Sequence, residues 1–256
     1  MRPDRLTVNL RPRSGFEAVD LGFALARRHA RELWRIWLLL VLPAMILLAL
    51  AEHALFGVLP STTCMLLWWG KPLYDAVVLL VLSRAVFGDR LSARGTLAEL
   101  RRVAGRIAGS LTLRRLSLSR SFLLPAHLLE GQHGKARSDR IHLLREETTA
   151  SARTLTMASG WLEVAALSGL LALLVWLTPE LYRSQWFNDF LQPVGHLELL
   201  GWQLAYIAAV TLIEPFYVAA GFALYLNRRT LLEAWDIEVA LKRVAARLPQ
   251  SAGVPD

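Results

Sequence analysis

The sequence has a single cysteine, Cys64, and few charged residues. One cysteine excludes an intramolecular disulfide framework and any metal site built from several cysteines. Charged residues make up 20% of the 256 residues and hydrophobic residues 54%, whereas a soluble domain carries about 25% and about 45–50%. This composition excludes an ordinary soluble domain of this length and favours a membrane protein.

Motifs of the common enzyme classes are also absent from the sequence. It contains no Walker A loop, no GxGxxG, no HExxH, no GxSxG and no CxxC. The spacings of His127, His133 and His142 match no standard metal site, and Ser119 and Ser121 near His127 lack a carboxylate at a recognisable spacing. We therefore expect a protein that is not an enzyme, with no catalytic residues, no metal and no cofactor.

Four apolar runs are long enough to cross a membrane, because about 20 helical residues span the ~30 Å hydrocarbon core. They cover residues 36–59, 62–87, 161–178 and 199–226. Gly70, Lys71 and Pro72 interrupt the second run, which predicts a tilt or a kink there. The predicted fold class is all-α: an integral membrane bundle of four transmembrane helices, with a helical cytoplasmic loop and a C-terminal amphipathic helix.

Arginine and lysine gather in three segments of the chain. Residues 1–35 contain eight, residues 88–159 contain thirteen and residues 227–256 contain five, so that these segments hold 26 of the 29 cations. Only Arg183 lies in the loop 179–196. Because cationic loops resist translocation, both termini and the middle loop are predicted to be cytoplasmic. The same placement beside the spans argues against a nucleic-acid partner, despite a formal net charge of +8.

These observations divide the chain into five segments. They are a cytoplasmic N-terminal segment with an interfacial helix (1–35), a first transmembrane hairpin (36–87), a cytoplasmic helical loop (88–159), a second transmembrane hairpin (160–226), and a cytoplasmic C-terminal amphipathic helix and tail (227–256).

The middle loop is predicted to contain a basic amphipathic helix. Thr96 and Glu99 have the spacing of a capping box. Arg101, Arg102 and Arg106 fall largely off the apolar stripe and are predicted to bind an acidic surface, either lipid headgroups or a partner protein. The alternative is that the helix packs on other cytoplasmic parts of the protein. The apolar stripe consists of Leu97, Leu100, Val103, Ile107 and Leu111.

Two further amphipathic helices are predicted near the termini. Thr230 and Glu233 have the spacing of a second capping box, which predicts that the C-terminal helix begins there. Its apolar stripe would be Ile237, Leu241, Val244 and Leu248. Near the N-terminus, a short interfacial helix is predicted from Phe16, Val19 and Phe23, followed by Arg27, Arg28 and Arg31.

Among the charged residues within or at the end of the predicted spans, four are candidate site residues: Lys71, Asp75, Arg84 and Glu214. A charge near the bilayer centre costs roughly 2.5–3.5 kcal/mol, so it usually marks an ion pair, a cavity or a function. Lys71 and Asp75 are four residues apart and are expected to pair within one helix. Glu214, which precedes Pro215, is expected to face the second span, with Lys71 or Arg84 as its partner. Small residues four apart also predict close packing of the third and fourth spans: Ala165 and Gly169, and Gly201, Ala205 and Ala209.

Three stretches carry a resemblance to a known family. They are WWGKPLYDAVVLLVLSRAVFG at 68–88, LSLSRSFLLPAHLLEGQHGKARSDR at 116–140 and IEPFYVAAGFALYLNRRTLLEAWDIEVAL at 213–241. The chain, roughly from residue 64 to 247, resembles multi-span bacterial inner-membrane proteins that are encoded beside MoxR-type AAA+ ATPases and von Willebrand A-like proteins. The resemblance implies the bacterial inner membrane as the location and a MoxR-type ATPase as a partner. The family has no assigned reaction, so no catalytic residues carry over.

The leading hypothesis is a non-enzymatic membrane anchor or scaffold that docks partners through its cytoplasmic loop. The alternative is a small transporter or channel subunit that uses Lys71, Asp75 and Glu214 within the membrane. A third, weaker hypothesis is a lipid-modifying or lipid-binding protein that uses Arg101, Arg102 and Arg106. The oligomeric state is left open.

Overall fold

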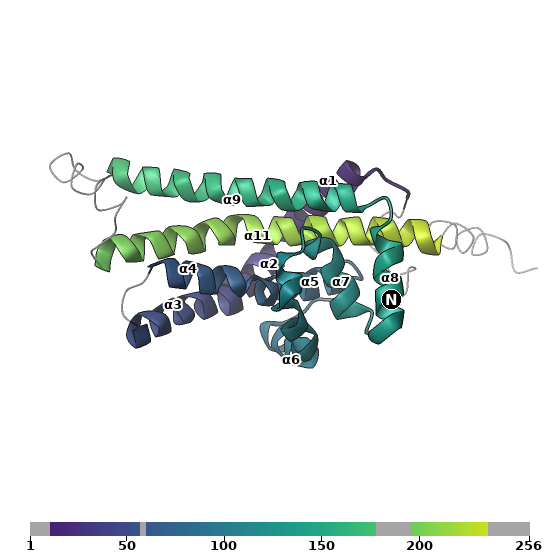
Figure 1. The fold of residues 1–256 in the computed structure, drawn as a ribbon, viewed down its shortest axis with the longest axis horizontal. Coiled ribbons are helices and arrows are strands. Elements are labelled where there is room, and N and C mark those ends of the chain that lie inside the picture. The colour runs from purple at the N-terminus through teal and green to yellow at the C-terminus, as the bar shows by residue number, and fades with distance from the viewer. Residues whose placement is uncertain (1–10, 57–59, 178–195, 235–256) are drawn as a thin grey trace, which may run out of the picture.

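The structure, a computed structural model, describes residues 11–56, 60–177 and 196–234 and is all-α over these ranges. Two long helices, α9 (Thr149–Leu177) and α11 (His196–Glu233), lie side by side along the molecule (Figure 1). The other helices pack around α11, which contacts α1, α3, α4, α5, α7, α8 and α9. The predicted fold class is therefore confirmed.

The remaining elements follow the chain in order. They are α1 (Gly15–Arg28), α2 (Ala30–Ile36), the π-helical turn η2 (Trp37–Val41), α3 (Leu42–Phe56), α4 (Pro60–Trp69), α5 (Lys71–Ala85), α6 (Ala93–Ser110), the 3₁₀ turn η3 (Leu113–Leu116), α7 (Arg120–Leu129) and α8 (Gly134–Arg145).

Within the described residues, four helical stretches are long and apolar enough to cross a membrane. They are Ala30–Glu52, Thr62–Ala85, Thr149–Leu177 and Gly201–Glu233. Their number agrees with the sequence prediction, although the first and third begin earlier and the fourth ends later than predicted. The break between α4 and α5 at Gly70 confirms the predicted interruption. It arises because Pro72 has no N–H and is tolerated in the first turn of a new helix.

The central helix is α11, and α9 is peripheral. Of the 18 most apolar consecutive residues, 72% are buried inside the molecule in α11, but only 6% in α9. The outward side chains of α9 include Trp161, Leu162 and Trp176, all largely exposed. An exposed apolar face of this kind suits contact with lipid, while α11 supplies the core on which the other helices assemble.

Glycines bring α1 and α7 close to α11. A Cβ on Gly22 would lie 2.4 Å from Cα of Ala220, and one on Gly221 would lie 2.4 Å from Cβ of Ser121. Any larger residue would push the helices apart. The predicted close packing is wrong at Gly169 and Gly201, because a Cβ at either position would meet no heavy atom within 4 Å. Ala205 and Ala209 are buried as predicted, and α9 packs on α11.

The helix α1 forms where the sequence predicts a short helix, and it packs on the bundle through small residues. Ser14 caps it, and Glu17 completes a capping box. Its buried residues, Ala18, Gly22, Leu25 and Ala26, are mostly small and lie against the core, whereas Phe16 is 69% exposed. Small side chains allow α1 to contact α11 closely. Val19 and Phe23 are half-buried at the edge of this contact.

Both predicted capping boxes are wrong. Ser92 caps α6, its Oγ accepting the Gly95 N–H at 3.1 Å, while Thr96 lies inside the helix and donates to the Ser92 carbonyl. Thr230 likewise lies inside α11 and donates to the Leu226 carbonyl. Threonine can bond back to the preceding turn of a helix, so the pattern alone does not distinguish a cap from an interior residue. The predicted stripe from Ile237 to Leu248 lies outside the described residues.

Candidate functional site

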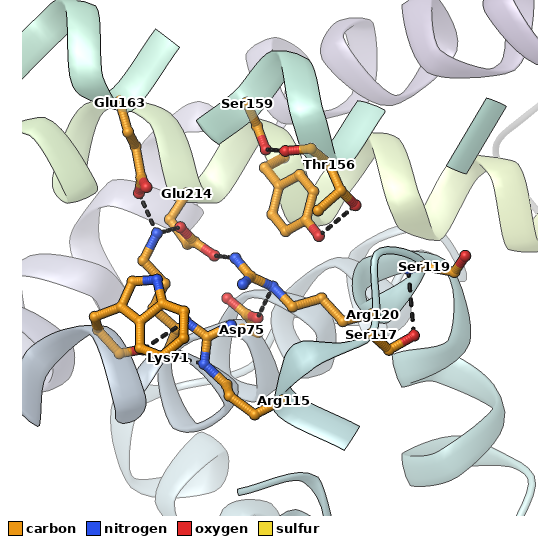
Figure 2. A network of polar contacts seen from close by, with 12 residues as sticks. Lys71, Asp75, Arg115, Ser117, Ser119, Arg120, Thr156, Ser159, Glu163 and Glu214 are labelled. Atoms are coloured by element: carbon orange, nitrogen blue, oxygen red, sulfur yellow. Dashed lines mark hydrogen bonds and ion pairs between the residues drawn. The ribbon is translucent and has the colours of Figure 1, made fainter. Parts of the chain in front are cut away.

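A cluster of charged side chains lies in the interior of the bundle (Figure 2). Five residues from four helices are linked by ion pairs: Lys71 and Asp75 of α5, Arg120 of α7, Glu163 of α9 and Glu214 of α11. We call these five residues the buried charge cluster. It joins segments that are more than 140 residues apart in the sequence.

Lys71 is the first residue of α5, and the break at Gly70 directs it inward. Its Nζ donates to Oε2 of Glu214 at 2.6 Å and also contacts Glu163. Lys71 and Glu214 are each only 1% exposed. A buried charge is tolerated when it has a partner of opposite sign and hydrogen bonds, and both conditions are met here.

Arg120 supplies the second cation of the cluster from the start of α7. Its Nη2 donates to Oε1 of Glu214 at 3.1 Å, and its Nε lies 3.9 Å from Oδ2 of Asp75. The guanidinium stands over the ring of Tyr217, 5.0 Å from the centroid, and the Tyr217 hydroxyl is hydrogen-bonded to Thr156. Burial acts to lower the pKa of Arg120, but Tyr217, Glu214 and Asp75 outweigh it and raise that pKa, so the side chain stays cationic.

Arg115, in η3, binds a backbone carbonyl that the helix break leaves free. The carbonyl of Trp68 would ordinarily accept the N–H of residue 72, but that residue is Pro72, which has none. Nε and Nη2 of Arg115 donate to this oxygen at 3.1 and 2.6 Å, and the guanidinium lies 4.0 Å above the Trp68 ring. Burial lowers the pKa of Arg115.

Of the contacts expected among the intramembrane charges, one is confirmed and one is wrong. Glu214 faces the second span, with Lys71 as its partner. The pair expected between Lys71 and Asp75 is wrong, because Lys71 turns to Glu163 and Glu214 while Asp75 faces Arg120. Carboxylates on neighbouring helices reach the buried ammonium more directly than one along the same helix.

Arg84, the other expected partner of Glu214, lies elsewhere. It is at the end of α5, where its Nη2 donates to Oε1 of Glu99 at 2.9 Å, and its side chain is 47% exposed. Arg84 therefore links α5 to α6 at the surface and takes no part in the buried charge cluster.

The three predicted surface arginines of α6 do not share one face. Arg101 and Arg102 are exposed, whereas Arg106 is half-buried and donates to the Leu128 carbonyl at 2.8 Å. Val103 and Ile107, from the predicted stripe, are buried. One side of α6 thus packs on the protein, and the outward side presents Arg101 and Arg102.

A second polar cluster fixes α7 and α8 to the end of α11. The Tyr225 hydroxyl donates to Oε1 of Glu130 at 2.7 Å, and Nε of Arg140 donates to Oε2 of the same carboxylate at 3.0 Å. Arg140 also contacts Glu233, which pairs with Arg229 one turn away. Together with the buried charge cluster, these contacts hold the predicted loop against the bundle at two places.

Sequence reasoning missed Glu163, Arg120 and Arg115 as site residues. Glu163 carried a local signal, since it is the only charged residue in the run 161–178. Arg120 and Arg115 had none, because they lie in a loop with thirteen cations. Their role depends on how η3 and α7 return to the bundle.

Within the described part of the chain, no three side chains among His, Cys, Asp and Glu gather in a way that could hold a metal ion. Comparisons with family models, with curated proteins and with solved structures find no match. The fold and the four candidate spans point to a multi-pass membrane protein.

Proposed function

We propose that this protein is a non-enzymatic scaffold of the bacterial inner membrane, with both termini and the segment 88–159 in the cytoplasm. In this proposal the bundle anchors a cytoplasmic layer, formed by α6, η3, α7 and α8, that docks a partner protein. The family resemblance suggests a MoxR-type AAA+ ATPase as that partner.

The observation that carries the proposal is the fixation of this layer to the spans. Arg115 binds the free carbonyl of Trp68, and Arg120 binds Glu214. Both arginines belong to the segment between the second and third spans, yet they reach the interior of the bundle. A layer held in this way is a preorganised surface, and a preorganised surface loses less entropy when a partner binds.

The outward face of α6 is the docking surface that this proposal favours. It presents Arg101 and Arg102 next to the half-exposed Leu97. Two cations beside an apolar side chain suit an acidic partner surface with an apolar centre.

The test is recovery of partners from native membranes with quantitative mass spectrometry. We compare the parent with a variant that combines Arg101→Glu and Arg102→Glu, and with a control that combines Lys135→Glu and Arg153→Glu. All four side chains are exposed, and the two control positions lie on α8 and α9. The parent and the control should retain the ATPase in stoichiometric amount, and the first variant should lose it by about tenfold or more. Equal recovery from all three proteins, or no ATPase with any, would contradict the proposal.

Transport is the second candidate, favoured by the meeting of Lys71, Asp75 and Glu214 inside the bundle. Against it, each of these charges faces one of opposite sign, which is the arrangement of a structural contact. The variant Glu214→Gln separates the two functions. A transporter should lose proton flux in proteoliposomes at unchanged abundance, whereas a scaffold should show no flux in the parent and unchanged partner recovery in the variant.

A further inference from the structure

A cavity of about 130 Å³ lies beside the buried charge cluster, between α5, the segment from η3 to α7, and α8. One water molecule needs about 10–15 Å³ of such volume, so the cavity has room for a group of several heavy atoms. Its polar lining consists of Asp75, Arg115, Ser117, Arg120, His127 and Arg145.

The charges of this lining are unequal. Three guanidinium groups face one carboxylate, that of Asp75. Arg120 is already bound to Glu214. Arg115 and Arg145 form no ion pair with any carboxylate among the described residues. The cavity therefore has an excess of positive charge that no carboxylate among the described residues matches.

Arg115 also has an unused hydrogen-bond donor. The residue is 2% exposed, and both of the described hydrogen bonds of its side chain go to the Trp68 carbonyl. Its Nη1 is buried and has no hydrogen-bond partner in the described part of the chain. A buried charged donor left unsatisfied is costly, so an acceptor is expected beside it.

We propose that this cavity binds a phosphoryl group, either inorganic phosphate or the headgroup of an anionic phospholipid. Nε and Nη2 of Arg115 bind the Trp68 carbonyl, so its Nη1 is the charged donor that would bind a phosphate oxygen. The hydroxyl of Ser117 is a further donor. Arg145 is exposed and supplies positive charge where the cavity meets the surface. The bound anion would connect α8 to α5 and to η3. This inference goes beyond the scaffold role and does not depend on it.

The first experiment measures thermal unfolding of the full-length protein in detergent, with inorganic phosphate added against chloride at equal ionic strength. The variants Arg145→Gln and Ser117→Ala leave the contact between Arg115 and Trp68 intact, so both should fold. Arg94→Gln is the control, because Arg94 is exposed and does not line the cavity. If the ligand is free phosphate, it should raise the unfolding temperature of the parent and the control, and each cavity variant should need about tenfold more phosphate for half of the effect.

The second experiment detects retained lipid by native mass spectrometry after purification from membranes with phosphatidylglycerol. If the ligand is a lipid headgroup, the parent and Arg94→Gln should retain this lipid, Arg145→Gln should lose it, and inorganic phosphate should have little effect. The proposal is overturned if neither phosphate nor the anionic lipid binds the parent, which would leave only water in the cavity. It is also overturned if all variants respond equally, which would indicate nonspecific attraction.

Discussion

Replacement of Glu214 by leucine should destabilise the bundle strongly, because Glu214 contacts two buried cations at once. Its Oε2 accepts from Lys71 at 2.6 Å and its Oε1 from Arg120 at 3.1 Å. Removal of one member of a buried ion pair costs about 3–5 kcal/mol, since the remaining charge stays buried without its partner. Lys71 keeps Glu163 and Arg120 keeps Asp75, so we expect Glu214→Leu to cost about 3 kcal/mol, the lower end of that range.

The variant Glu214→Gln should cost less, about 2 kcal/mol. Its amide oxygen still accepts from one of the two cations, but its NH2 group replaces the oxygen that accepted from the other. The control is Glu99→Leu, which removes a carboxylate from the partly exposed pair with Arg84. Exposed ion pairs contribute only about 0–1 kcal/mol, so this variant should resemble the parent.

The assay is unfolding by increasing mole fraction of sodium dodecyl sulfate in mixed micelles, monitored by the fluorescence of the nine tryptophans. The expected order of stability is parent, Glu99→Leu, Glu214→Gln and Glu214→Leu. A Glu214→Leu protein that unfolds at the same midpoint as the parent would refute the reasoning, because the carboxylate would then not be paired in the interior.

Two other predictions follow from the packing and from the distribution of charge. Gly221→Ala should destabilise by about 1–3 kcal/mol in the same assay because its Cβ would collide with α7, whereas Gly105→Ala, which meets open space within α6, should be neutral or stabilising by about 0.5–1 kcal/mol; equal effects would contradict the packing. In a Cys64→Ser background, a cysteine at Ser184 should react with an impermeant reagent in intact cells and one at Ser138 should not; the reverse pattern would contradict the topology.

The spans and the break in the second one could be predicted because they depend on local sequence. A long apolar run has few alternatives to a membrane helix. Pro72 has no N–H, so it interrupts the hydrogen bonding of a helix whatever surrounds that helix. The partner of Glu214 could be predicted to be one of two cations, Lys71 or Arg84, because a buried carboxylate needs a cation nearby within the membrane. The structure shows that the partner is Lys71.

The rest of the cluster depends on tertiary structure that no local pattern encodes. Arg120 resembles the other loop cations until α7 is placed against α11, and that placement rests on Gly221, whose missing side chain lets Ser121 approach. The pair expected between Lys71 and Asp75 was wrong for the same reason: helical spacing shows which groups can meet on one helix, but not which neighbours compete for them.

The central claim is that the segment between the second and third spans is folded onto the bundle through the buried charge cluster. Hydrogen exchange of the backbone amides of α7 (Arg120–Leu129), measured by mass spectrometry on the protein in lipid nanodiscs, tests this claim most directly. In the parent, α7 should be protected as strongly as α5, and in Glu214→Leu it should lose this protection. Exchange of α7 in the parent at the rate of an unstructured peptide would contradict the account.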